Sequence, residues 1–82
     1  MRFLLYSRTG CPLCEEMLSE LQAMPALSGY PVEVRDVDAD PHARLRFGHK
    51  IPVLLFGGEL VCHGCLDAEE VYKALAWHRR PV

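Results

Sequence analysis

FLLYSRTGCPLC, residues 3–14, joins an apolar run to a Cys-Pro-Leu-Cys motif, and this junction decides the fold. The apolar run is typical of a strand, and a helical pattern follows the first cysteine. Pro12 has a fixed φ and no N–H group, so it suits the first position of a helix and makes Cys11 the N-cap. The N–H groups of Leu13 and Cys14 can then point at the Cys11 sulfur. Because the positive end of a helix favours the thiolate, Cys11 is predicted to be a nucleophile.

Cys14 is the candidate resolving thiol. It lies three residues after Cys11, close enough along the first helical turn to attack a mixed disulfide at Cys11 and release the partner. The sequence shows neither the features of a signal peptide nor a stretch of membrane-spanning length, so we expect a cytoplasmic protein that does not bind membranes. In that reducing compartment a CxxC motif is more often catalytic or metal-binding than a structural disulfide.

The composition favours one small folded domain. The chain has 82 residues, of which 50% are hydrophobic and 24% charged, and this suits a single domain spanning residues 1–82 with a thin core. Its net charge of −2 gives no electrostatic reason to expect a nucleic-acid partner. We therefore expect a monomer whose partners are small thiols or proteins.

The rest of the chain alternates predicted strands and helices. A helical stripe runs from the cysteine pair to Pro25, and Gly57-Gly58 is typical of a tight hairpin turn. Asp67 is predicted to cap the last helix, with Glu70 completing a capping box, and Arg79-Arg80 suits the negative end of its dipole. The expected elements are a strand at 3–6, a helix from the cysteine pair to residue 25, a strand at 32–35, a short helix at 41–47, strands at 53–56 and 59–61, and a helix from 67 to about 78.

Three motifs, in this order, resemble those of the glutaredoxin-like branch of the thioredoxin superfamily. The first is SRTGCPLC, residues 7–14, in which a basic residue stands three before the first cysteine and proline follows that cysteine. The second is Ile51-Pro52, which is similar to the cis-proline of the family. The third is Gly64-Cys65-Leu66-Asp67, which is similar to the Gly-Cys-x-Asp stretch that opens the last helix. The resemblance implies an α/β, thioredoxin-like (glutaredoxin-like) fold with a four-stranded mixed sheet flanked by helices, and the activity of a small thiol-disulfide oxidoreductase.

The resemblance also implies how a substrate would bind beside the thiols. Arg8 would face the glycine carboxylate of glutathione. The backbone of Ile51 would pair with an extended thiol peptide, and a cis Pro52 would turn the polar groups of its neighbour toward the Cys11 sulfur.

The third motif would complete this binding surface. The N–H groups of Cys65 and Leu66, near the start of the helix capped by Asp67, would receive the other carboxylate of glutathione. Pro12 and Leu13 would belong to the same surface, where Leu13 replaces the aromatic residue that is common in glutaredoxins.

A second cysteine pair, Cys62-His63-Gly64-Cys65, leaves several interpretations open. Cys62 can be a small buried residue near a strand end, and Cys65 a residue at the start of the last helix. The pair can instead be a second redox couple, because in this fold the loop before the last helix lies near the first CxxC motif. Both pairs together can also supply the four thiolates of a tetrahedral zinc site.

The leading hypothesis is an oxidoreductase in which Cys11 attacks and Cys14 resolves. It needs no metal and no bound organic cofactor, and its partners are glutathione, as a co-substrate, or a disulfide-containing protein. The alternatives are a zinc-binding module that uses the two CxxC pairs, and a redox-inactive interaction domain with a thioredoxin fold.

Overall fold

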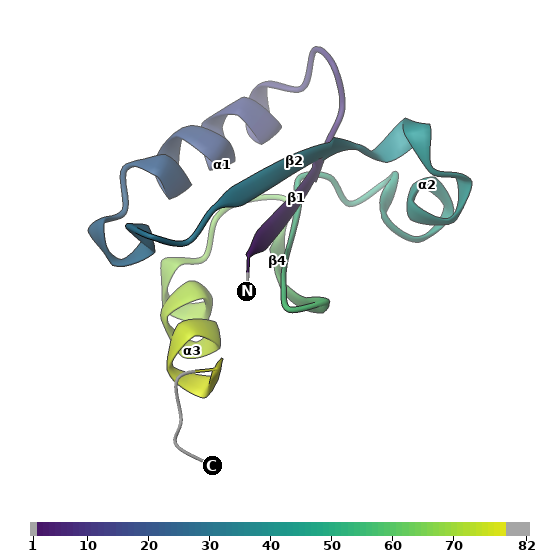
Figure 1. The fold of residues 1–82 in the computed structure, drawn as a ribbon. Helices are drawn as coiled ribbons and strands as arrows, with labels where there is room; N and C mark the ends of the chain where they lie inside the picture. The colour runs from purple at the N-terminus through teal and green to yellow at the C-terminus, as the bar shows by residue number, and fades with distance from the viewer. Residues whose placement is uncertain (1, 79–82) are drawn as a thin grey trace.

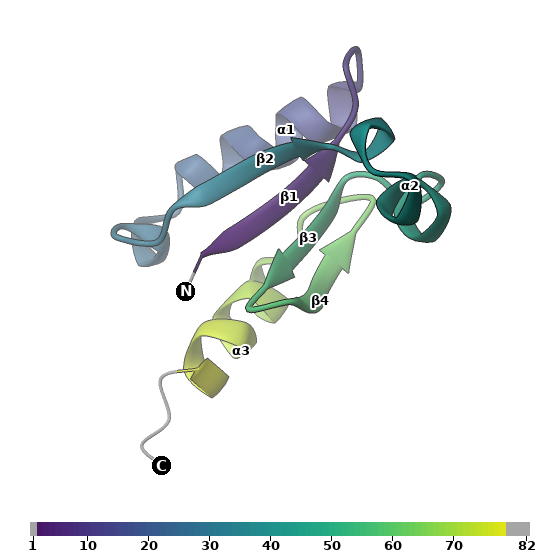
Figure 2. The same ribbon diagram turned by 45° about the vertical axis from the view of Figure 1, so that its right-hand side comes forward.

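A mixed four-stranded sheet with helices against it makes up the computed structural model, which describes residues 2–78 (Figure 1). Strand β1 (Phe3–Ser7) leads into helix α1 (Pro12–Gln22), and strand β2 (Val32–Asp36) then runs parallel to β1. Strands β3 (Val53–Phe56) and β4 (Glu59–His63) form a hairpin, and β3 pairs antiparallel with β1. The strand order is β2-β1-β3-β4, which confirms the predicted mixed sheet (Figure 2).

Two further α-helices and two short 3₁₀ helices complete the described part of the chain. They are η1 (Pro25–Leu27), η2 (Val37–Ala39), α2 (Pro41–Phe47) and α3 (Ala68–His78). The prediction for Arg79-Arg80 lies outside the described residues. Among residues 2–78, no helix has both the length and the apolar character needed to cross a membrane.

Alternation along the strands gives the sheet two buried faces. Phe3 and Leu5 of β1 point to the face where α1 and α3 pack, and they join one hydrophobic cluster with residues of both helices. Tyr6 points to the other face, where it packs with Phe47 of α2 and with Val53. The thiol-bearing junction after β1 is therefore anchored on both sides of the sheet.

Turn and cap residues explain most of the element boundaries. Gly57 and Gly58 have φ values of 60° and 84°, which glycine adopts readily, and they form the predicted hairpin turn. Asp40 caps α2, because its Oδ1 accepts hydrogen bonds from the amides of His42 (2.9 Å) and Ala43 (3.4 Å). In α3 the Oδ1 of Asp67 accepts from the amide of Glu70 at 3.2 Å, as the capping prediction requires.

Strands β1 and β2 each end one residue later than predicted, and two other boundaries differ by more. Helix α1 ends at Gln22 rather than at the proline, because a residue before proline avoids helical angles, and Met24 accordingly has φ −81° and ψ 116°. Strand β4 continues to His63 instead of stopping at residue 61. Its pairing with β3 shifts register at Val61, since Leu54 faces Cys62 while Leu55 faces Leu60.

Candidate active site

The junction of β1 and α1 holds the first cysteine pair. Cys11 has an extended backbone, with φ −105° and ψ 100°, and is the N-cap of α1, while Pro12 occupies the first helical position. The amide of Cys14 donates to the Cys11 sulfur at 3.3 Å, so one of the two predicted donors is in place. The sequence prediction of this local geometry is confirmed at Cys11, Pro12 and Cys14.

The two thiols of this pair have different surroundings. Cys11 is half-buried, whereas only 3% of Cys14 is exposed. Burial, and next the hydrogen bond with the Cys11 side chain, raise the pKa of Cys14 to about 11, against the opposing effect of Arg8. Both cysteines are free thiols, and Cys14 is therefore protonated at neutral pH while Cys11 is the thiol that a substrate can reach.

The guanidinium of Arg8 is hydrogen-bonded to other residues of the protein. Its Nε and Nη2 atoms donate to the two carboxylate oxygens of Asp38 at 2.6 and 2.8 Å, and its Nη1 atom donates to the carbonyl of Gly48 at 3.3 Å. This hydrogen-bonded pair raises the pKa of Arg8 and lowers the pKa of Asp38. Arg8 thus ties the thiol-bearing loop to η2 and to the end of α2, and its predicted contact with glutathione stays a prediction.

Sequence reasoning missed Asp38 and Gly48 as neighbours of the site. A usable signal was present for Asp38: parallel neighbouring strands end at the same sheet edge, and Ser7 pairs with Asp36. The residues that follow β1 and β2 must therefore lie close together. Gly48 had no comparable local signal, because its contact depends on where α2 packs.

The second motif has the predicted backbone form. The peptide bond between Ile51 and Pro52 is cis, and Pro52 is fully buried. The carbonyl of Pro52 accepts a hydrogen bond from the amide of Gly64 at 2.8 Å, which fastens the loop before α3 to the cis-proline segment. The pairing of Ile51 with a substrate peptide stays a prediction.

The third motif meets the first at a small cleft. Cys65 and Asp67 are exposed and Leu66 is half-buried. Cys65 and Leu66 line a cleft of about 120 Å³ together with Leu13, whose exposed fraction is 53%. Glu16 and Glu20 also line it, so α1 gives the cleft an acidic wall. The predicted carboxylate contacts of Cys65 and Leu66 stay a prediction.

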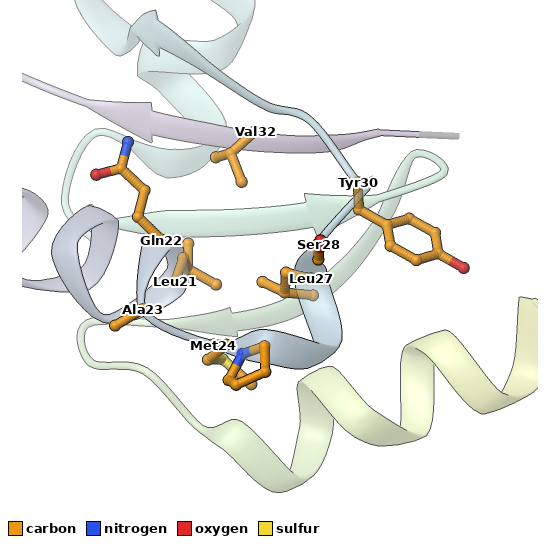
Figure 3. Close-up of a pocket in the computed structure, with 9 residues that line it drawn as sticks. Leu21, Gln22, Ala23, Met24, Leu27, Ser28, Tyr30 and Val32 are labelled. Carbon is orange, nitrogen blue, oxygen red and sulfur yellow. The ribbon is translucent and has the colours of Figure 1, made fainter.

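Other cavities lie around this site or away from it. One of about 330 Å³ reaches Cys14 between α1 and β2, and another of about 510 Å³ lies between Arg8 and α2. A third, of about 360 Å³, lies at the opposite end of α1, where Leu21, Met24 and Leu27 line it (Figure 3). The first two cavities border the thiol-bearing loop, whereas the third does not.

The two cysteine pairs do not form one metal site. Across residues 2–78, no group of three or more His, Cys, Asp or Glu side chains is arranged to hold a metal ion. A four-thiolate zinc site of the kind that the sequence allowed is therefore not assembled in this fold.

Comparison with known proteins identifies a domain family and a shared fold. The family model of the glutaredoxin-like domain (DUF836) matches residues 2–76. The solution NMR structure of protein Ne2328 from Nitrosomonas europaea is 29% identical, with a TM-score of 0.79 over 89% of this chain and 88% of that chain. Thioredoxin 1 from Thermosipho africanus is 16% identical, with a TM-score of 0.61 over 98% of this chain and 100% of that chain.

A third similar structure is that of a mutant of the thioredoxin-like protein BC3987, which is 23% identical, with a TM-score of 0.60 over 90% of this chain and 99% of that chain. At such identities the likeness shows the fold alone, and it confirms the predicted thioredoxin-like fold. No curated protein matches the sequence.

Proposed function

Because this chain belongs to the glutaredoxin-like domain family (DUF836), we propose that it is a thiol-disulfide oxidoreductase in which Cys11 attacks and Cys14 resolves. The observation that carries the proposal is the unequal pair at the start of α1. A reachable sulfur accepts a helix amide at 3.3 Å, and a buried, protonated thiol lies one helical turn away. This division suits one thiol for attack and the other for release.

The proposed reaction needs only the two thiols and a disulfide. The Cys11 thiolate attacks one sulfur of the substrate disulfide, the substrate S–S bond breaks, and the leaving sulfur takes up a proton. Cys14 then gives up its proton and attacks the Cys11 sulfur, which releases the second substrate sulfur and leaves a Cys11–Cys14 disulfide. Two electrons pass to the substrate, and a thiol reductant such as glutathione regenerates the dithiol.

Thiol counting in redox buffers tests this proposal. The Cys62→Ser/Cys65→Ser variant keeps only the first pair, and we expect both of its thiols to become resistant to alkylation in one two-electron transition in glutathione buffers. Adding Cys14→Ser to this background should leave a stable mixed disulfide with glutathione at Cys11. Adding Cys11→Ser should leave Cys14 free over the same range.

Two outcomes would overturn the proposal. In the first outcome, both thiols of the Cys62→Ser/Cys65→Ser variant would remain alkylatable in excess glutathione disulfide. In the second, both thiols would stay protected from alkylation until a chelator is added. The same titration gives the reduction potential of the Cys11–Cys14 disulfide. A potential of about −270 mV would indicate a reductase, and one of about −120 mV would indicate an oxidant.

A further inference from the structure

The second cysteine pair occupies a sharp bend that follows β4. Cys62 lies within the strand, opposite Leu54 of β3, and the chain bends at Gly64 and Cys65 before α3 begins. Gly64 has φ +79°, a value that glycine adopts readily and that lets the chain bend sharply here. Cys62 and Cys65 lie three residues apart, on either side of this bend. The two thiols also interact electrostatically.

The second pair repeats the division of the first. Cys65 is exposed, while Cys62 is half-buried and packs against the core cluster between the sheet and α3. Burial raises the pKa of Cys62. One thiol is thus open to a partner sulfur and the other is partly buried against the core, as at the start of α1.

The bend lies beside α1. Cys65 lines the same cleft as Leu13, the residue directly before Cys14 in the first motif. The hydrogen bond from the amide of Gly64 to the carbonyl of Pro52 holds the bend against the cis-proline segment. Segments from α1, the cis-proline loop and the bend before α3 therefore converge at one place.

We propose that the second pair, Cys62 and Cys65, is a redox couple that reduces the disulfide of the first pair through Cys11. The Cys65 thiolate attacks the Cys11 sulfur, the bond to Cys14 breaks, and Cys14 takes up a proton. Cys62 then gives up its proton and attacks Cys65, which breaks the Cys11–Cys65 bond and frees the Cys11 thiolate. The first pair gains two electrons and the second pair becomes a disulfide. This transfer of electrons from the second pair to the first, the relay, rests on the proposed function of the first pair. The formation of a disulfide between Cys62 and Cys65 does not depend on that function.

Removal of both resolving thiols, Cys14 and Cys62, should trap the intermediate of the relay, which is the Cys11–Cys65 disulfide. The Cys14→Ser/Cys62→Ser variant keeps Cys11 and Cys65, and 2-hydroxyethyl disulfide will place a mercaptoethanol adduct on Cys11. We expect Cys65 to displace that adduct and form an intrachain Cys11–Cys65 disulfide, seen by intact mass and peptide mapping. The rate should be independent of protein concentration.

The matched control is Cys14→Ser/Cys65→Ser, which keeps the half-buried Cys62 in place of Cys65. Its adduct on Cys11 should persist at least about tenfold longer, because a protonated and partly buried thiol is a poor attacking group. Equal persistence of the adduct in the two variants would show that Cys65 does not reach Cys11, and the relay would be wrong.

A separate variant tests the second couple without the first. In Cys11→Ser/Cys14→Ser, titrated in dithiothreitol redox buffers, we expect Cys62 and Cys65 to lose their reactivity to iodoacetamide in one two-electron step. If both stay alkylatable in fully oxidised buffer, no second couple exists. The redox role of the first pair is tested independently, with the Cys62→Ser/Cys65→Ser variant.

Discussion

At the scale of single residues, burial sets the chemistry of the thiol pair. Cys14 is almost inaccessible, and burial is the main reason that its pKa is raised to about 11. We expect iodoacetamide to alkylate Cys14 in the folded Cys11→Ser variant more slowly at pH 7 than an ordinary cysteine, because burial still raises the pKa of Cys14 when the Cys11 sulfur is absent. The rate should keep rising with pH above about pH 9, because only the thiolate reacts.

The same variant unfolded in urea is the control, and its alkylation rate should level off near pH 9. In the wild-type protein the folded-state pKa of Cys14 lies above its unfolded value, so the protonated thiol favours the folded protein below about pH 9, and this contribution is lost as pH rises toward 11. A plateau near pH 9 in the folded variant would contradict the prediction.

The ion pair of Arg8 and Asp38 competes with any anion that approaches Arg8. In Asp38→Asn the guanidinium loses its bidentate carboxylate partner. We expect the KM for a glutathione mixed disulfide to fall about two- to fivefold, the size of one exposed charge interaction, while the KM for uncharged 2-hydroxyethyl disulfide stays the same. The control, Asp36→Asn, removes one negative charge from the same sheet edge without releasing Arg8. An equal fall in KM in that variant would mean that the change in net charge, not the release of Arg8, causes the effect.

Local sequence therefore predicted the parts of the site that are formed locally. The proline after Cys11 and the three-residue spacing to Cys14 determine the N-cap geometry within one helical turn. The partner of Arg8 lies 30 residues away and depends on strand pairing, and the Gly48 carbonyl depends on the packing of α2. Neither contact has a signal in the residues beside Arg8.

At the scale of elements, one carboxylate begins the short helix α2. Asp40 accepts two backbone amides, and a helix of seven residues has little stability of its own. We expect Asp40→Ala to lower the free energy of unfolding by about 1 kcal/mol in urea denaturation. Asp40→Asn keeps an accepting oxygen and should cost only a few tenths. Equal losses in the two variants would mean that the charge, not the cap, supports α2.

The element order was predictable because each boundary has its own chemical marker. The glycine pair forms the hairpin turn, and the two aspartates cap α2 and α3. The register shift at Val61 has no such marker, because an extra residue in β4 is defined only against its partner strand. The early end of α1 follows from the effect of Pro25 on Met24, a restriction that acts on the residue before proline.

At the scale of the whole molecule, the sheet divides the core unequally. The face covered by α1 and α3 holds the larger cluster, including Phe3 and Phe56, while the face near α2 holds a smaller cluster around Tyr6 and Phe47. With 82 residues, the chain buries a small core, so its stability rests on few side chains. A change at the centre of the larger cluster should therefore affect every element that holds the thiols.

Phe56 provides that test. Its side chain is 1% exposed, its ring stacks on Phe3 with centroids 4.3 Å apart, and it meets the Tyr30 ring edge-on at 5.9 Å. We expect Phe56→Ala to lower the free energy of unfolding by about 3–5 kcal/mol, a large part of the total for a small domain. Leu45→Ala, at a site that is 85% exposed, is the control and should change it by less than about 0.5 kcal/mol. In the Phe56→Ala variant the alkylation of Cys14 should also rise at pH 7, because partial unfolding exposes the buried thiol. A protein that lost stability without exposing Cys14 would show that the thiol-bearing end of the sheet is held independently of the larger core.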